Sequence, residues 1–308
     1  MNTQSSTLPK SFEAQTGAPS VTAVRSLYWS IRRELWESRS IYIAPLAGAV
    51  VFLLGFLVSI VRLPQKMRAL SALDPAQQRE AIAMPYDMLA GLLMLTAMIV
   101  GAFYCLGALQ GERRDRSILF WKSLPVSDLT TVLAKASIPF VVLPLLTFAI
   151  TVATQWIMLL VSTVVLWANG LSPWTLWTRL SFFQMSLLLL YHLVTVHVLW
   201  EAPIYGWLLL VSAWARRAAF LWAALPLVAI GAVERLIFNT RHFSAMLENR
   251  ASGGGAEAIT MPGTLPMNPM THLTPGAYLS SSGLWIGLAF TAICLAAAVR
   301  LRRYRGSN

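Results

Sequence analysis

Long apolar runs separated by short charged segments dominate the chain and predict membrane-spanning helices. A helix needs about 20 apolar residues to cross about 30 Å of hydrocarbon. The runs that reach or approach this length are Ile41–Val61, Tyr86–Leu109, Thr131–Ala168, Leu180–Ala215, Ala218–Phe238 and Leu284–Val299. The pattern therefore predicts an all-α integral membrane protein with six transmembrane helices.

Two of these runs are longer than one crossing requires. Residues 131–168 and 180–215 would each form a helix of about 55 Å, at about 1.5 Å per residue. Pro139 and Pro144 lie in the first of them and Pro203 in the second, and proline removes a backbone donor and clashes with the preceding turn. We therefore predict a kink in each run, with seven or eight spans as the alternative.

Composition excludes most other classes of protein. Hydrophobic residues make up 56% of the 308 residues and charged residues only 12%, against about 25% in an ordinary soluble domain. These values exclude a disordered chain, a disulfide-rich secreted module and a coiled coil, and they argue against a soluble enzyme. We predict one transmembrane domain over residues 21–305, preceded by a disordered cytoplasmic tail over residues 1–20.

The net charge of +11 is unevenly distributed between the two sides of the membrane. With six spans both termini lie on one side, which carries 16 of the 24 lysines and arginines, against 8 on the other. Because cytoplasmic loops collect Lys and Arg, both termini are predicted to be cytoplasmic, and nucleic acid is not needed as a partner. Residues 239–282 then form a long outer loop.

Apolar residues also recur at helical spacing before the first span. The residues on this face are Val24, Leu27, Tyr28, Ile31 and Leu35. We predict an N-terminal amphipathic helix over residues 21–38 that lies on the inner surface of the membrane, because a span follows at once. A helix that binds a soluble partner is the alternative.

Residues 111–128, between the second and third runs, combine charge with aromatic side chains in the sequence GERRDRSILFWKSLPVSD. Pro125 interrupts a helix, and Ser127 and Asp128 are typical caps of the helix that follows. Two interpretations stay open. The segment anchors to lipid headgroups, or it docks its aromatic residues into a cytoplasmic partner, since aromatic side chains flanked by Arg are typical of interfaces.

This segment resembles the signature that follows the second span in bacterial ABC-2 type transporter permeases. Two later stretches resemble the same family: WEAPIYGWLLLVSAWARRAAFLW, from Trp200, and LWIGLAFTAICLAAAVRLRRYR, from Leu284. With the six-span order, the resemblance covers most of residues 25–305. It implies the type V exporter fold in the bacterial inner membrane, and a homodimer of permeases bound to two separate ATPase subunits.

By the same resemblance, residues 112–124 form a coupling helix that docks on the ATPase. The coupling residues are then Glu112, Arg113, Arg114, Asp115, Ser117, Phe120, Trp121 and Lys122. The chain has no GxxxxGK[ST] loop to hold a triphosphate, so ATP and magnesium belong on the partner subunit. We expect this chain to bind no cofactor or metal and to perform no enzymatic chemistry.

Ionisable groups at membrane depth are costly and mark candidate functional residues. His197 and Glu201 lie four residues apart on one predicted helical face, and His192 is near in sequence. Three interpretations stay open: a structural pair beside Pro203, a contact with substrate or a proton, and a metal site. A metal site is disfavoured because His192 lies about 140° around the helix from His197, with no third ligand near.

Phe103, Tyr104 and Glu234 are the other cavity or gate candidates. The resemblance implies that the second and fifth spans line the transport cavity, which would include Phe103 and Tyr104; contact with lipid or with other helices is the alternative. Glu234 and Asp87 lie near the outer ends of their spans. Three interpretations stay open for each: a part of an outer gate, a contact with headgroups, or a pair at a subunit contact.

The leading functional hypothesis is the permease subunit of an ATP-driven exporter that moves a hydrophobic or amphipathic drug, peptide or lipid by alternating access. The first alternative is a membrane scaffold that recruits a cytoplasmic complex through residues 112–124. The second is a membrane enzyme that uses His192, His197 and Glu201. The outer loop also carries residues that could bind a soft metal, although a mobile or membrane-resting loop explains them without a ligand: Met261, Met267, Met270 and His272.

Overall fold

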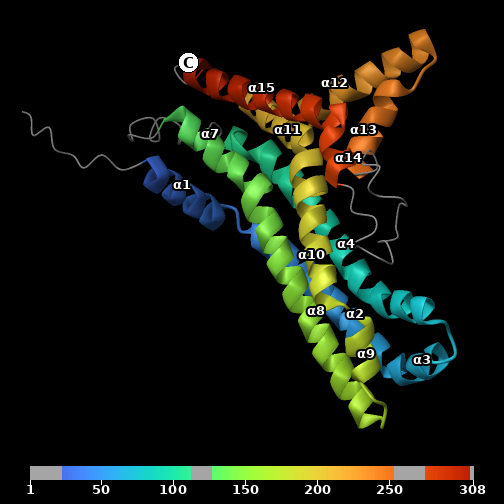
Figure 1. Cartoon of the computed structure of the whole chain (residues 1–308). Helices are drawn as coiled ribbons and strands as arrows, with labels where there is room; N and C mark the ends of the chain where they lie inside the picture. The colour runs from blue at the N-terminus through green and yellow to red at the C-terminus, as the bar shows by residue number, and fades with distance from the viewer. Residues whose placement is uncertain (1–22, 112–126, 253–274, 306–308) are drawn as a thin grey trace, which may run out of the picture.

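The computed structural model describes residues 23–111, 127–252 and 275–305, which are helical apart from short turns (Figure 1). The helices are α1 (Ala23–Glu37), α2 (Ser40–Ser59), α3 (Leu63–Leu70), α4 (Pro75–Ala108), α7 (Asp128–Ser137), α8 (Leu143–Ala168), α9 (Trp174–Arg179), α10 (Phe182–His192), α11 (Ala202–Trp214), α12 (Ala219–Val233), α13 (His242–Ser252), α14 (Pro275–Ser280) and α15 (Ser282–Arg305). A 3₁₀ turn and three π-helical segments extend some of them: Ile60–Arg62, Ile138–Val142, Leu193–Trp200 and Glu234–Phe238. These residues contain no strand, as the all-α prediction requires.

Six helices in the described ranges are long and apolar enough to cross a membrane, which confirms the number predicted. They extend over Ser40–Leu70, Pro75–Ala108, Asp128–Ala168, Phe182–Trp200, Ala219–Phe238 and Ser282–Tyr304. The chain is therefore a multi-pass membrane protein. The residues predicted to be amphipathic form α1, and its position on the membrane surface stays a prediction, as does the side on which the termini lie.

The third apolar run forms one continuous helix over Asp128–Ala168. Its π-helical turn, Ile138–Val142, contains Pro139, and Pro144 follows in the first turn of α8. A π turn accommodates the missing proline N–H without ending the helix, since the hydrogen-bond ladder widens there. The prolines therefore deform this span without dividing it.

The fourth apolar run is divided at Glu201. The span Phe182–Trp200, called here the α10 span, ends at this residue, and α11 begins directly after it. Pro203 lies in the first turn of α11, where a missing N–H leaves no intrahelical bond unmade. Figure 1 shows α11 turned away from the α10 span to lie beside α15, with which it makes its most extensive contact.

Buried apolar side chains form two main clusters along these helices. One surrounds Tyr205 of α11 and joins it to α4 and α8, and the other surrounds Leu93 and Met158, between α2, α4 and α8. Glycine permits close approaches between helices. A Cβ atom at Gly101 would lie 3.1 Å from Tyr205 Cε1, and one at Gly206 would lie 3.2 Å from the Cα of Thr291 on α15.

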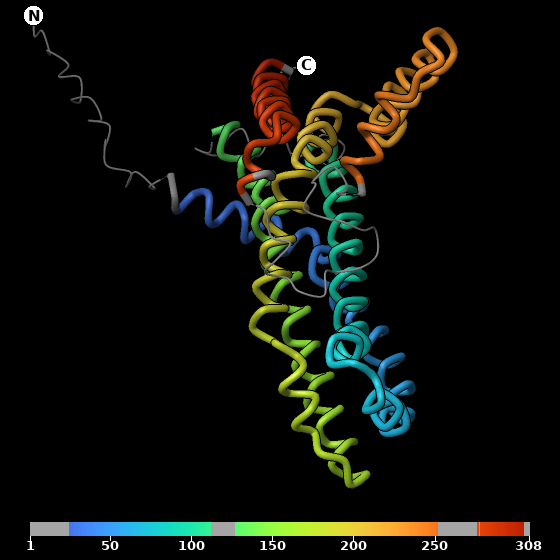
Figure 2. Tube along the Cα trace, turned by 45° about the vertical axis from the view of Figure 1, so that its right-hand side comes forward, coloured from blue at the N-terminus to red at the C-terminus, as the bar shows by residue number. Residues whose placement is uncertain are grey.

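Helices α12 and α13 form a hairpin that projects from the remaining helices (Figures 1 and 2). The span Ala219–Phe238 is almost entirely exposed. Phe220, Leu225 and Val228 are 63%, 61% and 68% exposed. An apolar surface of this extent is stable only against lipid or another protein chain.

Candidate functional site

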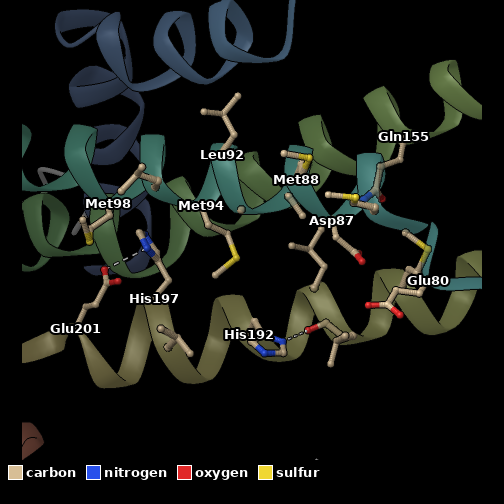
Figure 3. Close-up of a pocket in the computed structure, with 18 of the residues that line it drawn as sticks. Glu80, Asp87, Met88, Leu92, Met94, Met98, Gln155, His192, His197 and Glu201 are labelled. Carbon is tan, nitrogen blue, oxygen red and sulfur yellow. Dashed lines mark hydrogen bonds and ion pairs between the residues drawn. The ribbon is translucent and has the colours of Figure 1, made fainter. Parts of the chain in front are cut away.

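A groove of about 900 Å³ runs along α4, between this helix and the α10 span (Figure 3). Gln155 of α8 and Ala251 of α13 add to its lining. Binding sites for drug-sized molecules typically enclose about 300–1,000 Å³. The groove is therefore large enough for such a molecule, and it lies within the membrane-spanning helices.

Methionine is the most frequent residue type in the lining of the groove. The residues that form this methionine wall are Met84, Met88, Met94, Met98 and Met185. The first four lie on α4 in two pairs spaced by four residues, so that the members of each pair share a helical face. Methionine side chains are flexible and polarizable and adapt to ligands of different shapes. The wall is thus suited to apolar ligands of different shapes.

Acidic side chains lie toward both ends of the groove. Glu80 and Asp87 are nearer the Pro75 end of α4, and Glu201 is at the opposite end (Figure 3). Asp87 lies about 32 Å along α4 from Ala108, at about 1.5 Å per residue, which is close to the thickness of the hydrocarbon. None of the described residues that line the groove is Lys or Arg. The charged groups of the lining are therefore acidic.

His197, Glu201 and Tyr205 form a buried cluster at the junction between the α10 span and α11. The Nδ1 atom of His197 lies 3.3 Å from Oε2 of Glu201, and the Tyr205 hydroxyl donates to the same oxygen at 2.8 Å. The three side chains are almost completely buried. These contacts favour a structural pair that holds the junction, although His197 and Glu201 also line the groove.

His192 and Gln155 also contribute polar atoms to the groove. Nδ1 of His192 lies 2.9 Å from the Leu188 carbonyl oxygen, to which it donates in the matching tautomer. Nε2 of Gln155 donates to the Tyr86 carbonyl at 3.2 Å, while its Oε1 has no hydrogen-bond partner in the described part of the chain. His192 and His197 do not belong to a cluster of three or more His, Cys, Asp or Glu side chains within the described ranges, so a metal site has no support there.

Arg250 of α13 lies beside the Glu201 end of the groove without lining it. Its guanidinium stacks 4.0 Å from the centre of the Trp200 ring, and it donates to the carbonyl oxygens of Trp200, at 3.0 Å, and of Gly283. Partial burial lowers the pKa of Arg250 from its usual value, but arginine keeps its proton in proteins. This cation is therefore engaged with Trp200 and the start of α15.

The remaining cavity or gate candidates lie away from the groove. Phe103 is 66% exposed and is not part of the lining. Tyr104 is buried and donates its hydroxyl hydrogen to Oε2 of Glu34 at 2.8 Å. Glu234 accepts backbone hydrogen bonds from His242 and Phe243 at the start of α13, at 2.7 and 3.0 Å, where a carboxylate is favourable to the helix. Both Tyr104 and Glu234 thus have structural partners.

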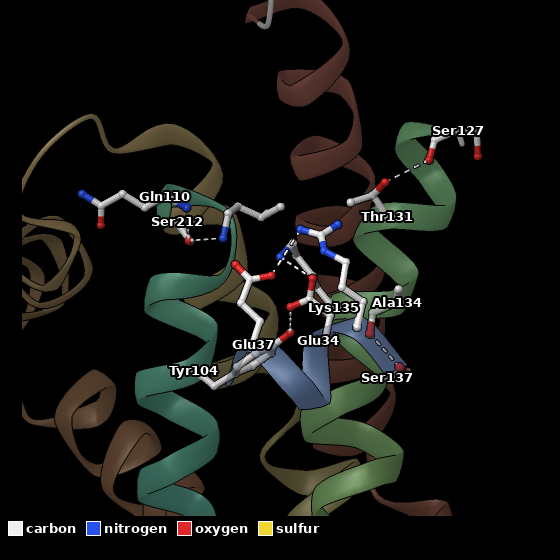
Figure 4. Close-up of polar contacts among 12 residues, drawn as sticks. Glu34, Glu37, Tyr104, Gln110, Ser127, Thr131, Ala134, Lys135, Ser137 and Ser212 are labelled. Atoms are coloured by element: carbon white, nitrogen blue, oxygen red, sulfur yellow. Dashed lines mark hydrogen bonds and ion pairs between the residues drawn. The ribbon is translucent and has the colours of Figure 1, made fainter. Parts of the chain in front are cut away.

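A second group of polar residues, the polar hub, joins α1, α4 and α7 (Figure 4). Nζ of Lys135 lies 2.8 Å from Oε1 of Glu34, and both side chains are almost fully buried. With Tyr104 on its other oxygen, the Glu34 carboxylate is hydrogen-bonded on both sides. A buried ion pair needs such additional hydrogen bonds to offset the cost of desolvation.

Nearby contacts fix the helix ends that flank residues 112–126. The Ser212 hydroxyl of α11 accepts hydrogen bonds from the backbone N–H groups of Leu109 and Gln110, at 2.9 and 3.1 Å. Nε of Arg302 on α15 donates to Oδ1 of Asp128 at 3.0 Å. The end of α4 is thus tied to α11, and the start of α7 is tied to α15.

The predicted coupling residues between these two ends lie outside the described residues. They are Glu112, Arg113, Arg114, Asp115, Ser117, Phe120, Trp121 and Lys122. The soft-metal ligands of the outer loop also lie outside them: Met261, Met267, Met270 and His272. Ser127 caps α7 as predicted, because its hydroxyl accepts from the Thr130 N–H at 3.1 Å.

Comparison with protein-family models, curated proteins and solved structures finds no match to this chain. Function is therefore inferred from the groove and from the contacts beside residues 112–126. The sequence patterns had not pointed to Glu80, Gln155 or the methionine wall. The spacing of four residues within the pairs Met84–Met88 and Met94–Met98 was a visible signal of a shared face.

Proposed function

We propose that this chain is the permease subunit of an ATP-driven exporter of the ABC-2 type, in the bacterial inner membrane. Two copies would assemble with two separate ATPase subunits and move a hydrophobic or amphipathic molecule by alternating access. The observation that carries the proposal is the course of α4, which lines the groove and ends at Ala108, next to residues 112–126. One helix thus joins a binding site to the segment that resembles a coupling helix.

The contacts of this region support a mechanical route from that segment to both walls of the groove. A displacement of residues 112–126 acts directly on α4, the first wall. Through Ser212 it also acts on α11, which continues from the α10 span, the second wall. Small shifts of packed helices are a common means of opening and closing a site. The proposed exporter would use this route to change the access of the groove.

A scaffold that recruits a complex through residues 112–124 remains the second candidate, because those residues suit docking whether or not transport follows. The groove favours the permease, since a scaffold has no need of a cavity within its spans. A membrane enzyme has less support. His197 and Glu201 are engaged with each other and with Tyr205, which favours a structural role for this set over an acid–base one.

The experiment that tests the proposal is purification of the full chain from its native membrane in a mild detergent. We expect a separate ATP-binding polypeptide to co-purify in equal amount, with ATP hydrolysis that vanadate inhibits. Mass spectrometry and a phosphate-release assay measure the two results. A chain that is recovered intact without any nucleotide-binding partner would overturn the proposal, and a partner that hydrolyses ATP but never moves a compound would favour the scaffold.

A further inference from the structure

We infer that the groove binds a hydrophobic organic cation, with its charge near Asp87 and Glu80 and its apolar body against the methionine wall. This inference names the substrate class of the proposed permease and rests on that proposal for its role in transport. Binding itself requires only the residues of this chain. The inference follows from the charge of the groove, from an unpartnered buried oxygen and from the nature of the apolar wall.

The first observation is the unbalanced charge of the lining. Asp87 is only partly exposed, and it has no hydrogen bond or ion pair within the described ranges. Asp87 lies near the edge of the hydrocarbon, and a partly buried carboxylate without a partner there attracts a cation. Glu80 lies two turns away on the same helix, and no Lys or Arg in the described lining offers a counter-charge. A cationic ligand would supply it.

The second observation is the amide of Gln155. Gln155 is only 2% exposed, and it lines the groove toward the end that carries Asp87 and Glu80 (Figure 3). Its Oε1 has no hydrogen-bond partner in the described part of the chain, although a buried polar atom is normally paired. A carbonyl oxygen attracts positive charge and repels an anion. Gln155 therefore favours the same sign of ligand as Asp87.

The third observation is the methionine wall, which sets the apolar part of the ligand. Thioethers make favourable contacts with aromatic and alkyl groups, and their flexible chains fit varied shapes. Soft metal ions such as Ag(I) also bind thioethers, but the wall extends from Met84 to Met98, about 21 Å along α4 at 1.5 Å per residue. An extended wall suits an organic body better than a single ion.

The test is equilibrium binding of radiolabelled tetraphenylphosphonium to the full-length chain in detergent micelles. We expect saturable binding that unlabelled tetraphenylphosphonium displaces and that the neutral triphenylphosphine oxide displaces far less. Asp87→Asn should weaken the affinity about tenfold, since it removes the nearest charge but keeps the shape of the side chain. Asp74→Asn is the matched control, because Asp74 precedes the same helix and does not line the groove; its affinity should equal that of the wild type.

Two further measurements keep the inference open to refutation. Asp87→Glu retains the charge and should bind as the wild type does, even if Asp87→Asn folds poorly. Equal affinity of Asp87→Asn and the wild type, or equal displacement by the neutral oxide, overturns the inference, as does binding of Ag(I) in place of the phosphonium. Phosphonium binding without a co-purified ATPase would leave the cation site intact and refute the exporter alone, whereas an active exporter that does not bind the phosphonium would refute only the cation site.

Discussion

Replacing Glu34 by glutamine is expected to lower the free energy of unfolding by about 3 kcal/mol, because the Lys135 ammonium stays buried without this carboxylate. The same change weakens the hydrogen bond from the Tyr104 hydroxyl, which a neutral amide accepts less strongly. The polar hub joins three helices, so its loss should loosen α1 from α7. Unfolding of the purified chain in mixed detergent and dodecyl sulfate micelles measures the difference.

Glu37→Gln is the matched control for this prediction. Glu37 lies on the same helix and pairs with Arg33 at 3.2 Å, but its side chain is 58% exposed, and exposed pairs contribute about 0–1 kcal/mol. The double variant Glu34→Met, Lys135→Met should be more stable than Glu34→Gln, since two apolar side chains replace a buried pair without leaving a charge. If Glu34→Gln unfolds together with the wild type, Glu34 does not hold these helices together.

If the proposed ATPase partner exists, replacing Trp121 by alanine is expected to weaken its binding to this chain by about 30-fold, the loss that corresponds to about 2 kcal/mol for an aromatic anchor at an interface. The physical reason is the loss of a large apolar side chain in a segment rich in charge. The ATPase that co-purifies with the chain is immobilised, and its affinity for each purified variant is measured by biolayer interferometry.

Trp167→Ala provides the comparison. Trp167 is 78% exposed near the end of α8 and lies about 60 Å along its helix from Asp128, at 1.5 Å per residue, so its removal should leave the affinity unchanged. Thermal stability of both variants should match that of the wild type. Equal affinities for Trp121→Ala and Trp167→Ala would mean that residues 112–124 do not dock on the ATPase.

The number and approximate position of the spans could be predicted from the sequence, because the hydrophobic requirement of a bilayer is a local property of the chain. The effect of proline could be predicted only in part. Pro139 is absorbed by a π-helical turn within a continuous helix, whereas the chain is divided at Glu201, beside Pro203, although a π-helical segment precedes that break too. The presence of proline in a run therefore did not by itself predict whether the helix would bend or end.

The groove, too, could be predicted from the sequence only in part. Asp87, His192, His197 and Glu201 could be recognised as costly groups within apolar runs. Their assembly with Gln155 from α8 could not, because it depends on how α4, α8 and the α10 span pack. The pairing of Glu34 with Lys135 likewise joins residues 101 positions apart in the sequence. No periodic pattern predicts such contacts.

The most direct test of the proposed alternating access is a distance measured across the groove in the proposed complex with the ATPase. Cysteines that carry spin labels replace Ile99 on α4 and Val194 on the α10 span, which are each 45% exposed and do not line the groove. Alanine replaces the two buried native cysteines, Cys105 and Cys294. Pulsed electron paramagnetic resonance compares the nucleotide-free complex with the complex trapped by ATP and vanadate. Alternating access predicts that the distance between the labels changes by about 5 Å, the scale of one helical turn. An unchanged distance in a complex that hydrolyses ATP would contradict it.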